Sequence, residues 1–497
     1  MTSRGALAGV SWNLIAGATA GASIVFATPW YVRALGLEGF GVVGLWLTLQ
    51  LLVGFLDLGF GAALMRRLAA QADGPEETAR QVATARSLES VVLFVAVGIA
   101  VALLLGARPL LDQWLRWSVP ADSPLVLALR LMGLSIALQF PSLLYTSGLL
   151  GLHRHKAVSL LQGGGALLRH GGGVAVVLGG GGLVGFFALQ AVVSFAQTAA
   201  ARLAFRGALG QGWRGVGWVD MAALREVRSY SAGMALTSLA AVALGNADRL
   251  LASRMLSAEA FGGYAIAFTA AGLLQLGIQP FYRTYFPRFT RAVSAADPAG
   301  IVSEYFAGSR LLSHVLVPIG VTVLWFAPDI LTAWVGRAEP EQVGVLRWLT
   351  VGVAMAGLGW LPAALQQAHG WTQLHFGMML AALGLGTLAA WAAFPSLGAQ
   401  AATLVWLVHG GLGLSVELAL MHRRILRGWL LRWYRVVLLT PLLVALPVVA
   451  LVYALRPDPT GRVTAALWPA LALGLGWAAT LLLARRVPVP SVSPSAS

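Results

Sequence analysis

The chain has 497 residues, a formal net charge of +15 and no cysteine. Hydrophobic residues make up 58% of it, charged residues only 11%, and its mean hydropathy is +0.77. Soluble domains carry about 25% charged residues, so this composition excludes a soluble enzyme. The absence of cysteine excludes disulfides, thiol catalysis and thiolate metal sites.

In chain order, the sequence alternates between short polar loops and apolar runs of about 20 residues or more, the length needed to cross a bilayer core of about 30 Å. We predict fourteen transmembrane helices and therefore an all-α integral membrane protein. The predicted spans are 7–29, 40–65, 87–106, 124–149, 157–179, 182–204, 230–253, 261–284, 310–333, 344–367, 372–394, 398–421, 436–455 and 463–484.

The distribution of basic residues predicts the orientation of these spans, because cytoplasmic loops are enriched in Lys and Arg. With the N-terminus in the cytoplasm, most of the 34 basic residues lie in cytoplasmic loops. Three lie within spans: Arg130, Arg169 and Arg249. Eight lie in loops on the outer side of the membrane: Arg33, Arg108, Arg116, Arg254, Arg337, Arg347, Arg456 and Arg462. We therefore expect a multi-pass protein of the bacterial inner membrane with both termini in the cytoplasm and no nucleic-acid partner.

Two short motifs recur at nearly one offset, which indicates an internal duplication. Arg33-x-Leu35-x-x-Glu38-x-Phe40-Gly41 matches Arg254-x-Leu256-x-x-Glu259-x-Phe261-Gly262, and Ala107-x-x-x-Leu111-x-x-Trp114 matches Ala327-x-x-x-Leu331-x-x-Trp334. Six spans separate the copies, and an even number preserves orientation, so we expect parallel six-helix repeats of the kind found in transporters.

The duplication predicts the domain organisation. We expect an N-terminal half at 1–205, a cytoplasmic linker at 206–229, a C-terminal half at 230–421, two additional helices at 422–484 and a disordered tail at 485–497. In transporters built from such repeats, substrates bind near the midplane between the halves.

Several stretches resemble the polysaccharide-biosynthesis flippases of the multidrug/oligosaccharidyl-lipid/polysaccharide exporter superfamily. They are Tyr31-Val-Arg-Ala-Leu-Gly-Leu-Glu-Gly-Phe-Gly41, Phe55-Leu-Asp-Leu-Gly-Phe-Gly61 with Arg66-Arg67, Asn246-Ala-Asp-Arg-Leu-Leu251 and Ala260-Phe-Gly-Gly-Tyr264. The resemblance implies a flippase that moves a polyprenyl-pyrophosphate-linked oligosaccharide, such as an O-antigen or exopolysaccharide unit, from the inner to the outer leaflet. It also implies membrane lipids, proton or sodium coupling and glycan polymerase or export proteins as partners.

Charges within spans are candidate functional residues, because a charge at the bilayer centre costs about 2.5–3.5 kcal/mol or more. Arg169 lies about 18 Å from the predicted inner surface, at 1.5 Å per residue, with His170 beside it. Arg130 lies in the outer part of its span. We predict that these three residues form a cationic cavity wall that binds pyrophosphate or an acidic sugar. The alternatives are a structural contact for Arg169 and snorkelling to the interface for Arg130.

Four further residues are candidates for gating or ion coupling: Asp57, Asp248, Arg249 and Asn13. For Asp57 the alternative is a salt bridge with Arg66 or Arg67, and for Asn13, as for Gln139, it is a helix–helix hydrogen bond.

Motifs for other chemistry are missing from the sequence, which contains no P-loop and no HExxH motif. We therefore predict a transporter and not an enzyme, with no cofactor, no catalytic residues and no metal site. A peptidoglycan-precursor flippase and a cation-coupled drug antiporter of the same fold remain alternatives, as does a membrane glycan polymerase or ligase.

Overall fold

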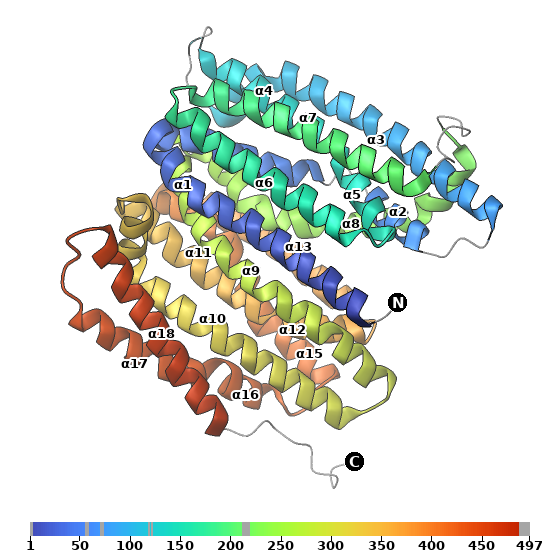
Figure 1. Ribbon diagram of the computed structural model, residues 1–497. Helices are drawn as coiled ribbons and strands as arrows, with labels where there is room; N and C mark the ends of the chain where they lie inside the picture. Colours follow the sequence, from blue (N-terminus) through green and yellow to red (C-terminus); the bar gives the residue numbers. More distant parts are fainter. Residues whose placement is uncertain are drawn as a thin grey trace. The chain divides into compact units, whose positions relative to one another are not determined.

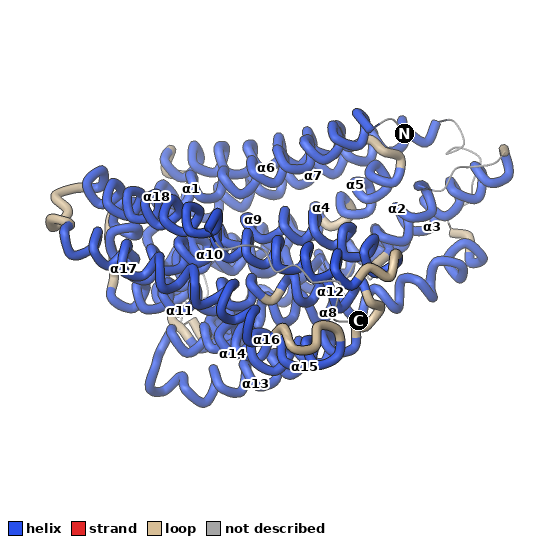
Figure 2. Tube along the Cα trace, turned by 90° about the horizontal axis from the view of Figure 1, so that it is seen from below, coloured by secondary structure: helices blue, strands red, loops and turns tan. Residues whose placement is uncertain are grey.

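A computed structural model describes residues 3–54, 59–69, 74–117, 120, 123–210 and 219–486 of the chain. Within these residues the protein is built from helices and contains no strand. Figure 2 shows the helices joined by short loops. The predicted all-α membrane fold is confirmed.

The contacts divide the chain into two units, the first comprising residues 1–246 and 253–262 and the second comprising 247–252 and 263–497. The domain boundaries expected from the duplication stay a prediction. The helices of the first unit are α1 (Ser3–Val53), α2 (Phe60–Ala69), α3 (Pro75–Pro109), the π-helix η2 (Leu110–Leu115), α4 (Pro124–Gln139), α5 (Ser142–Gly151), α6 (His155–Leu178), α7 (Gly182–Leu209) and most of α8 (Met221–Met255).

The second unit begins within α8 and α9 (Ala258–Ser294). It continues with α10 (Pro298–Val335), α11 (Pro340–Leu358), α12 (Trp360–Ala368), α13 (Gln373–Leu397), the 3-10 helix η4 (Gly398–Thr403), α14 (Leu404–Leu412), the π-helix η5 (Gly413–Glu417), α15 (Leu418–Arg424), α16 (Leu430–Trp433), the π-helix η6 (Tyr434–Leu439), α17 (Thr440–Leu455) and α18 (Arg462–Arg486).

Ten segments of the described chain are long and apolar enough to cross a membrane. Two of them, Gly17–Leu51 and Gln373–Arg424, each cover two of the fourteen predicted spans. Two further predicted spans correspond to α6 and α8, which are helical but are not among the ten. Within the described residues, all fourteen predicted spans therefore coincide with helices.

In the first unit, α3, α4 and α7 pack side by side, and α6 packs against both α1 and α7 (Figure 1). The long helix α1 contains a sharp kink at Gly36, whose φ of 73° and ψ of −179° are readily adopted only by glycine. This kink lies within the first repeated motif, between the first two predicted spans.

The two copies of the repeated Phe-Gly motif contact each other within the first unit. A Cβ atom added at Gly41 would collide with the carbonyl oxygen of Ala258, and one added at Gly262 would collide with that of Leu37. Gly41 and Gly262 are 221 residues apart, as are Leu37 and Ala258. Such a reciprocal contact is typical of surfaces related by two-fold rotation, and it explains why both copies require glycine.

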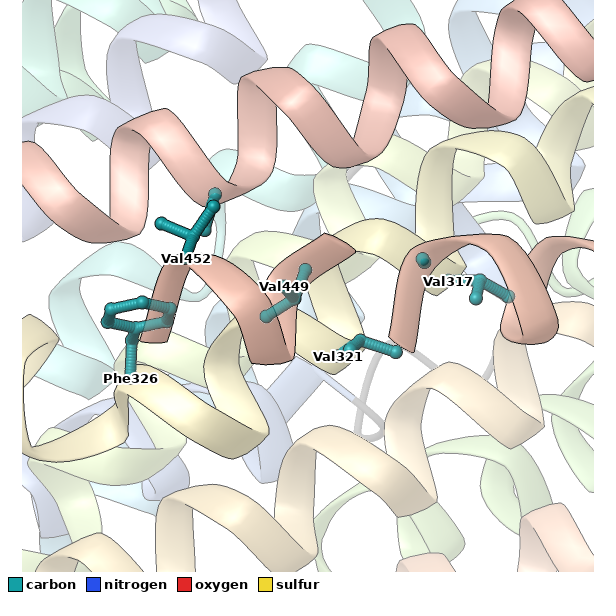
Figure 3. Packing of buried hydrophobic residues seen from close by; sticks show 7 residues of the cluster. Val317, Val321, Phe326, Val449 and Val452 are labelled. Atoms are coloured by element: carbon teal, nitrogen blue, oxygen red, sulfur yellow. The ribbon is translucent and has the colours of Figure 1, made fainter. Parts of the chain in front are cut away.

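In the second unit, α17 and α18 pack on α10 through an apolar cluster (Figure 3). Its buried members are Val317, Val321, Phe326, Ala445, Val449, Val452 and Ala472. At one end of this contact the guanidinium of Arg456 bonds Asp329 at 3.1 Å. The last two helices are thus an integral part of the second unit.

Candidate functional site

Two spans of the first unit are interrupted partway along their length. The helix α4 ends at Gln139 and α5 begins at Ser142, with Pro141 between them. Proline has no backbone N–H and clashes with the preceding turn, so it breaks the helix here. The hydroxyl of Thr198 on α7 donates a 2.7 Å hydrogen bond to the carbonyl oxygen of Leu138, which satisfies a backbone group near the break.

The second interruption lies between α1 and α2. The helix α1 ends at Val53, and α2 begins at Phe60 directly after Gly59, whose φ is 79°. Glycine is the residue that adopts this conformation without steric cost.

A small cavity of about 50 Å³ lies where the two interrupted spans meet. It is lined by Gln50, Val53 and Gly54 from the first span and by Ile136, Gln139, Phe140 and Leu143 from the second. Inside the cavity wall, the Gln50 carboxamide donates a 2.6 Å hydrogen bond to Oε1 of Gln139. The site therefore combines paired amides with apolar walls, the usual composition of a small-molecule site.

By residue count, this cavity lies near the middle of the two interrupted spans. The segment Pro124–Gly151 has 28 residues, and Gln139 lies close to its centre, about 22 Å from Pro124 at 1.5 Å per residue. Transporters commonly place their binding sites at such depth, on interrupted helices. Gln139 was recognised in the sequence as a polar residue within a span, whereas Gln50 was missed, although it precedes Gly54 in a similar span.

The predicted cationic residue Arg169 lies on α6 and is buried. Its guanidinium donates hydrogen bonds to Ser194 Oγ at 3.0 Å and to Gln197 Oε1 at 2.7 Å, both on α7. In turn, the amide of Gln190 donates to the backbone oxygen of Arg169 at 3.1 Å. Arg169 thus makes the helix–helix contacts of the structural alternative, with neutral partners in place of a carboxylate.

The neighbouring His170 is also buried, between α6 and α1. Its backbone oxygen accepts a 3.1 Å hydrogen bond from the hydroxyl of Tyr31, and its Nδ1 lies 3.4 Å from the same hydroxyl. Its ring also lies 6.4 Å from that of Trp46. Arg169 and His170 therefore tie α6 to two different neighbours.

Arg130 is exposed on α4, three residues after the exposed Leu127. It lies nine residues before Gln139, which at about 100° per residue places the two on opposite sides of the helix. The structure thus does not bring Arg130 together with the cavity.

Asp248 and Arg249 are buried in the second unit and point to different partners, as expected for adjacent helical residues. Oδ2 of Asp248 accepts a 2.7 Å hydrogen bond from the hydroxyl of Tyr264 on α9. The guanidinium of Arg249 lies over the ring of Phe268, 4.0 Å from its centroid. Both residues therefore link α8 to α9.

Two predicted residues fall outside the part of the chain whose side chains are described. Asp57 lies between residues 54 and 59, and Asn13 belongs to the first turns of α1. Their proposed roles stay predictions.

A buried ionic network in the first unit was not predicted from the sequence. The carboxylate of Glu89 on α3 accepts hydrogen bonds from the hydroxyl of Tyr145 at 2.7 Å and from Arg202 at 2.6 Å, and it pairs with Arg206 at 3.5 Å. Glu89 lies near the start of its predicted span, close to the predicted inner surface of the membrane. An acidic residue at that position was the sequence feature that could have indicated the network.

The sequence profile of the family described as "Polysaccharide biosynthesis protein" matches residues 6–293. A search of curated proteins found no match.

Solved structures with the same fold are transporters. The lipid II flippase MurJ in an inward closed conformation aligns over 96% of this chain and 98% of its own, with a TM-score of 0.73 and 10% identity. An inward-facing multidrug resistance MATE family transporter of the MOP superfamily aligns over 81% of this chain and 94% of its own, with a TM-score of 0.67 and 14% identity. The MATE multidrug transporter DinF-BH aligns over 85% of this chain and 96% of its own, with a TM-score of 0.61 and 15% identity.

Proposed function

The chain belongs to the polysaccharide biosynthesis protein family, and from this premise we propose that it is a flippase for a polyprenyl-pyrophosphate-linked oligosaccharide. It moves this lipid from the inner to the outer leaflet of the bacterial inner membrane by alternating access. The observation that carries the proposal is the pair of amides, Gln50 and Gln139, beside a small cavity near the middle of two interrupted spans of a transporter fold.

The paired amides at the cavity are suited to contact part of a glycan. Each carboxamide of Gln50 and Gln139 offers two N–H donors and one carbonyl acceptor, which complement sugar hydroxyls. The cavity volume of about 50 Å³ is below the range of about 300–1,000 Å³ for small-molecule sites, so this conformation does not enclose a sugar residue, and the two amides contact the glycan in a wider state of the route. The polyprenyl tail stays in the bilayer, where it needs no protein cavity.

Within this proposal the cationic residues have distinct roles. Arg169 and His170 hold α6 against α7 and α1 and so position the wall of the route. Arg130, which is exposed, contacts the pyrophosphate or an outer-leaflet headgroup. Asp57, next to the cavity in sequence, and Asn13, Asp248 and Arg249 take part in gating.

The proposal is tested by removing the gene and measuring lipid-linked oligosaccharide. Deletion leads to accumulation of one lipid-linked glycan on the inner leaflet, and the wild-type gene restores export. Complementation with Gln50→Leu or Gln139→Leu restores it poorly at normal protein levels. Gln162→Leu is the matched control, because Gln162 is an exposed span glutamine that does not line the cavity. Normal glycan export after deletion contradicts the function.

A drug antiporter of the same fold is the second candidate, because two of the similar structures are multidrug transporters. The alignment with the MATE transporter covers 81% of this chain, whereas that with MurJ covers 96%. Both shares reflect fold and chain length, and it is the match to the polysaccharide biosynthesis protein family that favours the flippase. Efflux of a cationic dye that depends on this gene, without glycan accumulation on deletion, supports the antiporter instead.

A further inference from the structure

A buried acid–base cluster lies in the second unit, outside the cavity described above. Glu417 is the last residue of the π-helix η5 and is only 5% exposed. Its Oε1 accepts a 2.9 Å hydrogen bond from the amide of Gln366 on α12 and lies 2.9 Å from Nδ1 of His375 on α13. Three separate helical segments thus converge on one carboxylate.

The cluster has one end near water and one end inside the unit. The side chain of His375 is 28% exposed and lies three residues into α13, next to a loop predicted to be cytoplasmic. Two turns before Glu417, His409 lies on α14, its ring 6.2 Å from that of Trp406. The arrangement connects the cytoplasmic rim to the interior of the unit.

Gln366 provides a second, independent observation. It is fully buried, and its Oε1 has no hydrogen-bond partner among the described residues. A buried acceptor without a donor is costly, at about 1–3 kcal/mol. A carboxylate offers no donor, but a protonated carboxyl group carries one O–H. The unpaired oxygen of Gln366 therefore suits a neighbouring Glu417 that binds a proton.

The backbone at the cluster also departs from a regular α-helix. Residues Gly413–Glu417 form a π-helical turn, a feature that occurs frequently at functional sites. Gln366 lies on α12, which is separated from α11 by an interruption at Gly359. The cluster thus joins two irregular spans, which can rearrange at lower cost than regular helices.

We propose that Glu417, His375 and Gln366 form the proton-binding site that couples transport to the proton gradient. A proton from water first binds the imidazole of His375. The N–H bond at Nδ1 then breaks and an O–H bond forms on Glu417, leaving a neutral imidazole and a neutral carboxyl group that donates to Oε1 of Gln366. Loss of the carboxylate charge weakens the charge-assisted bonds that tie α12 and α13 to η5.

The elements packed against η5 carry other charged and titratable groups. On α15, Arg423 is exposed, and the guanidinium of Arg424 lies over the ring of Trp371, 4.3 Å from its centroid. On α15, Nδ1 of His422 is hydrogen-bonded to the backbone oxygen of Leu418, and its ring packs 5.7 Å from that of Tyr305. At the far end of α11, Glu341 accepts from the backbone N–H of Ala399, and Arg347 donates to the backbone oxygen of Leu324. Glu417 and His375 are the acid and base that face each other directly, 2.9 Å apart.

The first test does not depend on transport. Infrared difference spectra of the reconstituted full-length protein, recorded between neutral and acidic pH, should contain the C=O band of a protonated carboxyl group. Glu417→Gln removes that band and His375→Gln shifts the pH at which it appears. Glu304→Gln is the control, because Glu304 is an exposed carboxylate of the same unit, paired with Arg288 at 3.3 Å. A band unchanged in Glu417→Gln, or one that responds to sodium at constant pH, overturns the proposal.

The second test rests on the proposed function. Wild-type protein in liposomes flips a lipid-linked oligosaccharide faster when a pH gradient is imposed, and Glu417→Gln loses that acceleration but keeps the gradient-independent rate. If the wild type flips no glycan lipid, the proposed function fails, while the spectra still test the proton site. If Glu417→Gln does not fold, as judged by gel filtration, His375→Gln and Glu417→Asp take its place. Acceleration equal to that of the wild type in both of them then contradicts the proposal.

Discussion

The guanidinium of Arg169 crosses from α6 to α7 to reach a hydroxyl and an amide, and neither partner is charged. A buried cation with neutral partners is held by hydrogen bonds alone, so each bond contributes noticeably to stability. The same residue was expected from the sequence to face substrate, and its observed contacts give a stability effect that can be measured separately from transport.

Arg169→Ala should lower the free energy of unfolding by roughly 1–3 kcal/mol, because Ser194 and Gln197 lose their donor. Thermal unfolding of the purified protein in detergent measures this change. Arg130→Ala is the control and should change stability by about 0.5 kcal/mol or less, because Arg130 is exposed. Normal stability together with lost export in Arg169→Ala indicates that Arg169 contacts substrate directly.

At the scale of elements, the polar groups of both candidate sites lie near positions where a span is interrupted. Pro141 interrupts α4–α5, and Pro362, 221 residues later, lies just after the interruption between α11 and α12. The duplicated offset therefore extends to these breaks. In both units the span at this position is divided near a polar group, Gln139 in the first and Gln366 in the second.

Pro141→Ala should let α4 and α5 form one continuous helix and so distort the cavity at Gln139. Glycan export should fall several-fold while the protein level stays normal. Pro124→Ala is the matched control, because Pro124 occupies the first turn of α4, where proline costs little. Export is measured by complementation of the deletion strain. Equal export in both variants means that the break does not shape the site.

The reciprocal glycine contact makes a second prediction at this scale. Gly41→Leu and Gly262→Leu should each separate α1 from the start of α9, with similar losses of stability, because each side chain would meet a backbone carbonyl. Gly17→Leu should be tolerated, since no atom lies within 4 Å of a Cβ at that position. Expression and thermal unfolding in detergent measure the difference. A harmless Gly41→Leu is inconsistent with the close approach of the two motif copies.

For the whole molecule, fourteen spans require both termini on one side of the membrane. The chain has no cysteine, so single cysteines can be introduced without prior substitutions. Asp458→Cys, between α17 and α18, should react with an impermeant maleimide added to spheroplasts. Ser294→Cys and Gly428→Cys should react only after the membrane is opened. Labelling of Ser294→Cys and Gly428→Cys from outside, without labelling of Asp458→Cys, rejects the predicted orientation.

The sequence by itself determined the membrane class, the positions of the spans and the repeat offset. These properties depend on runs of apolar residues whose length the bilayer sets, and such runs are local in the chain. The same argument located Gln139, Arg169 and Asp248 within spans, because a polar residue stands out in an apolar run.

Only the tertiary structure decided which polar residues meet. Gln50 and Gln139 are separated by 89 residues, Glu89 and Arg202 by 113, and His375 and Glu417 by 42. Each contact depends on the rotation and depth of one helix against another, and on where a proline or a π-helical turn shifts that register. Hydropathy is averaged around a helix and contains no information on that rotation, so these pairs could not be read from the sequence.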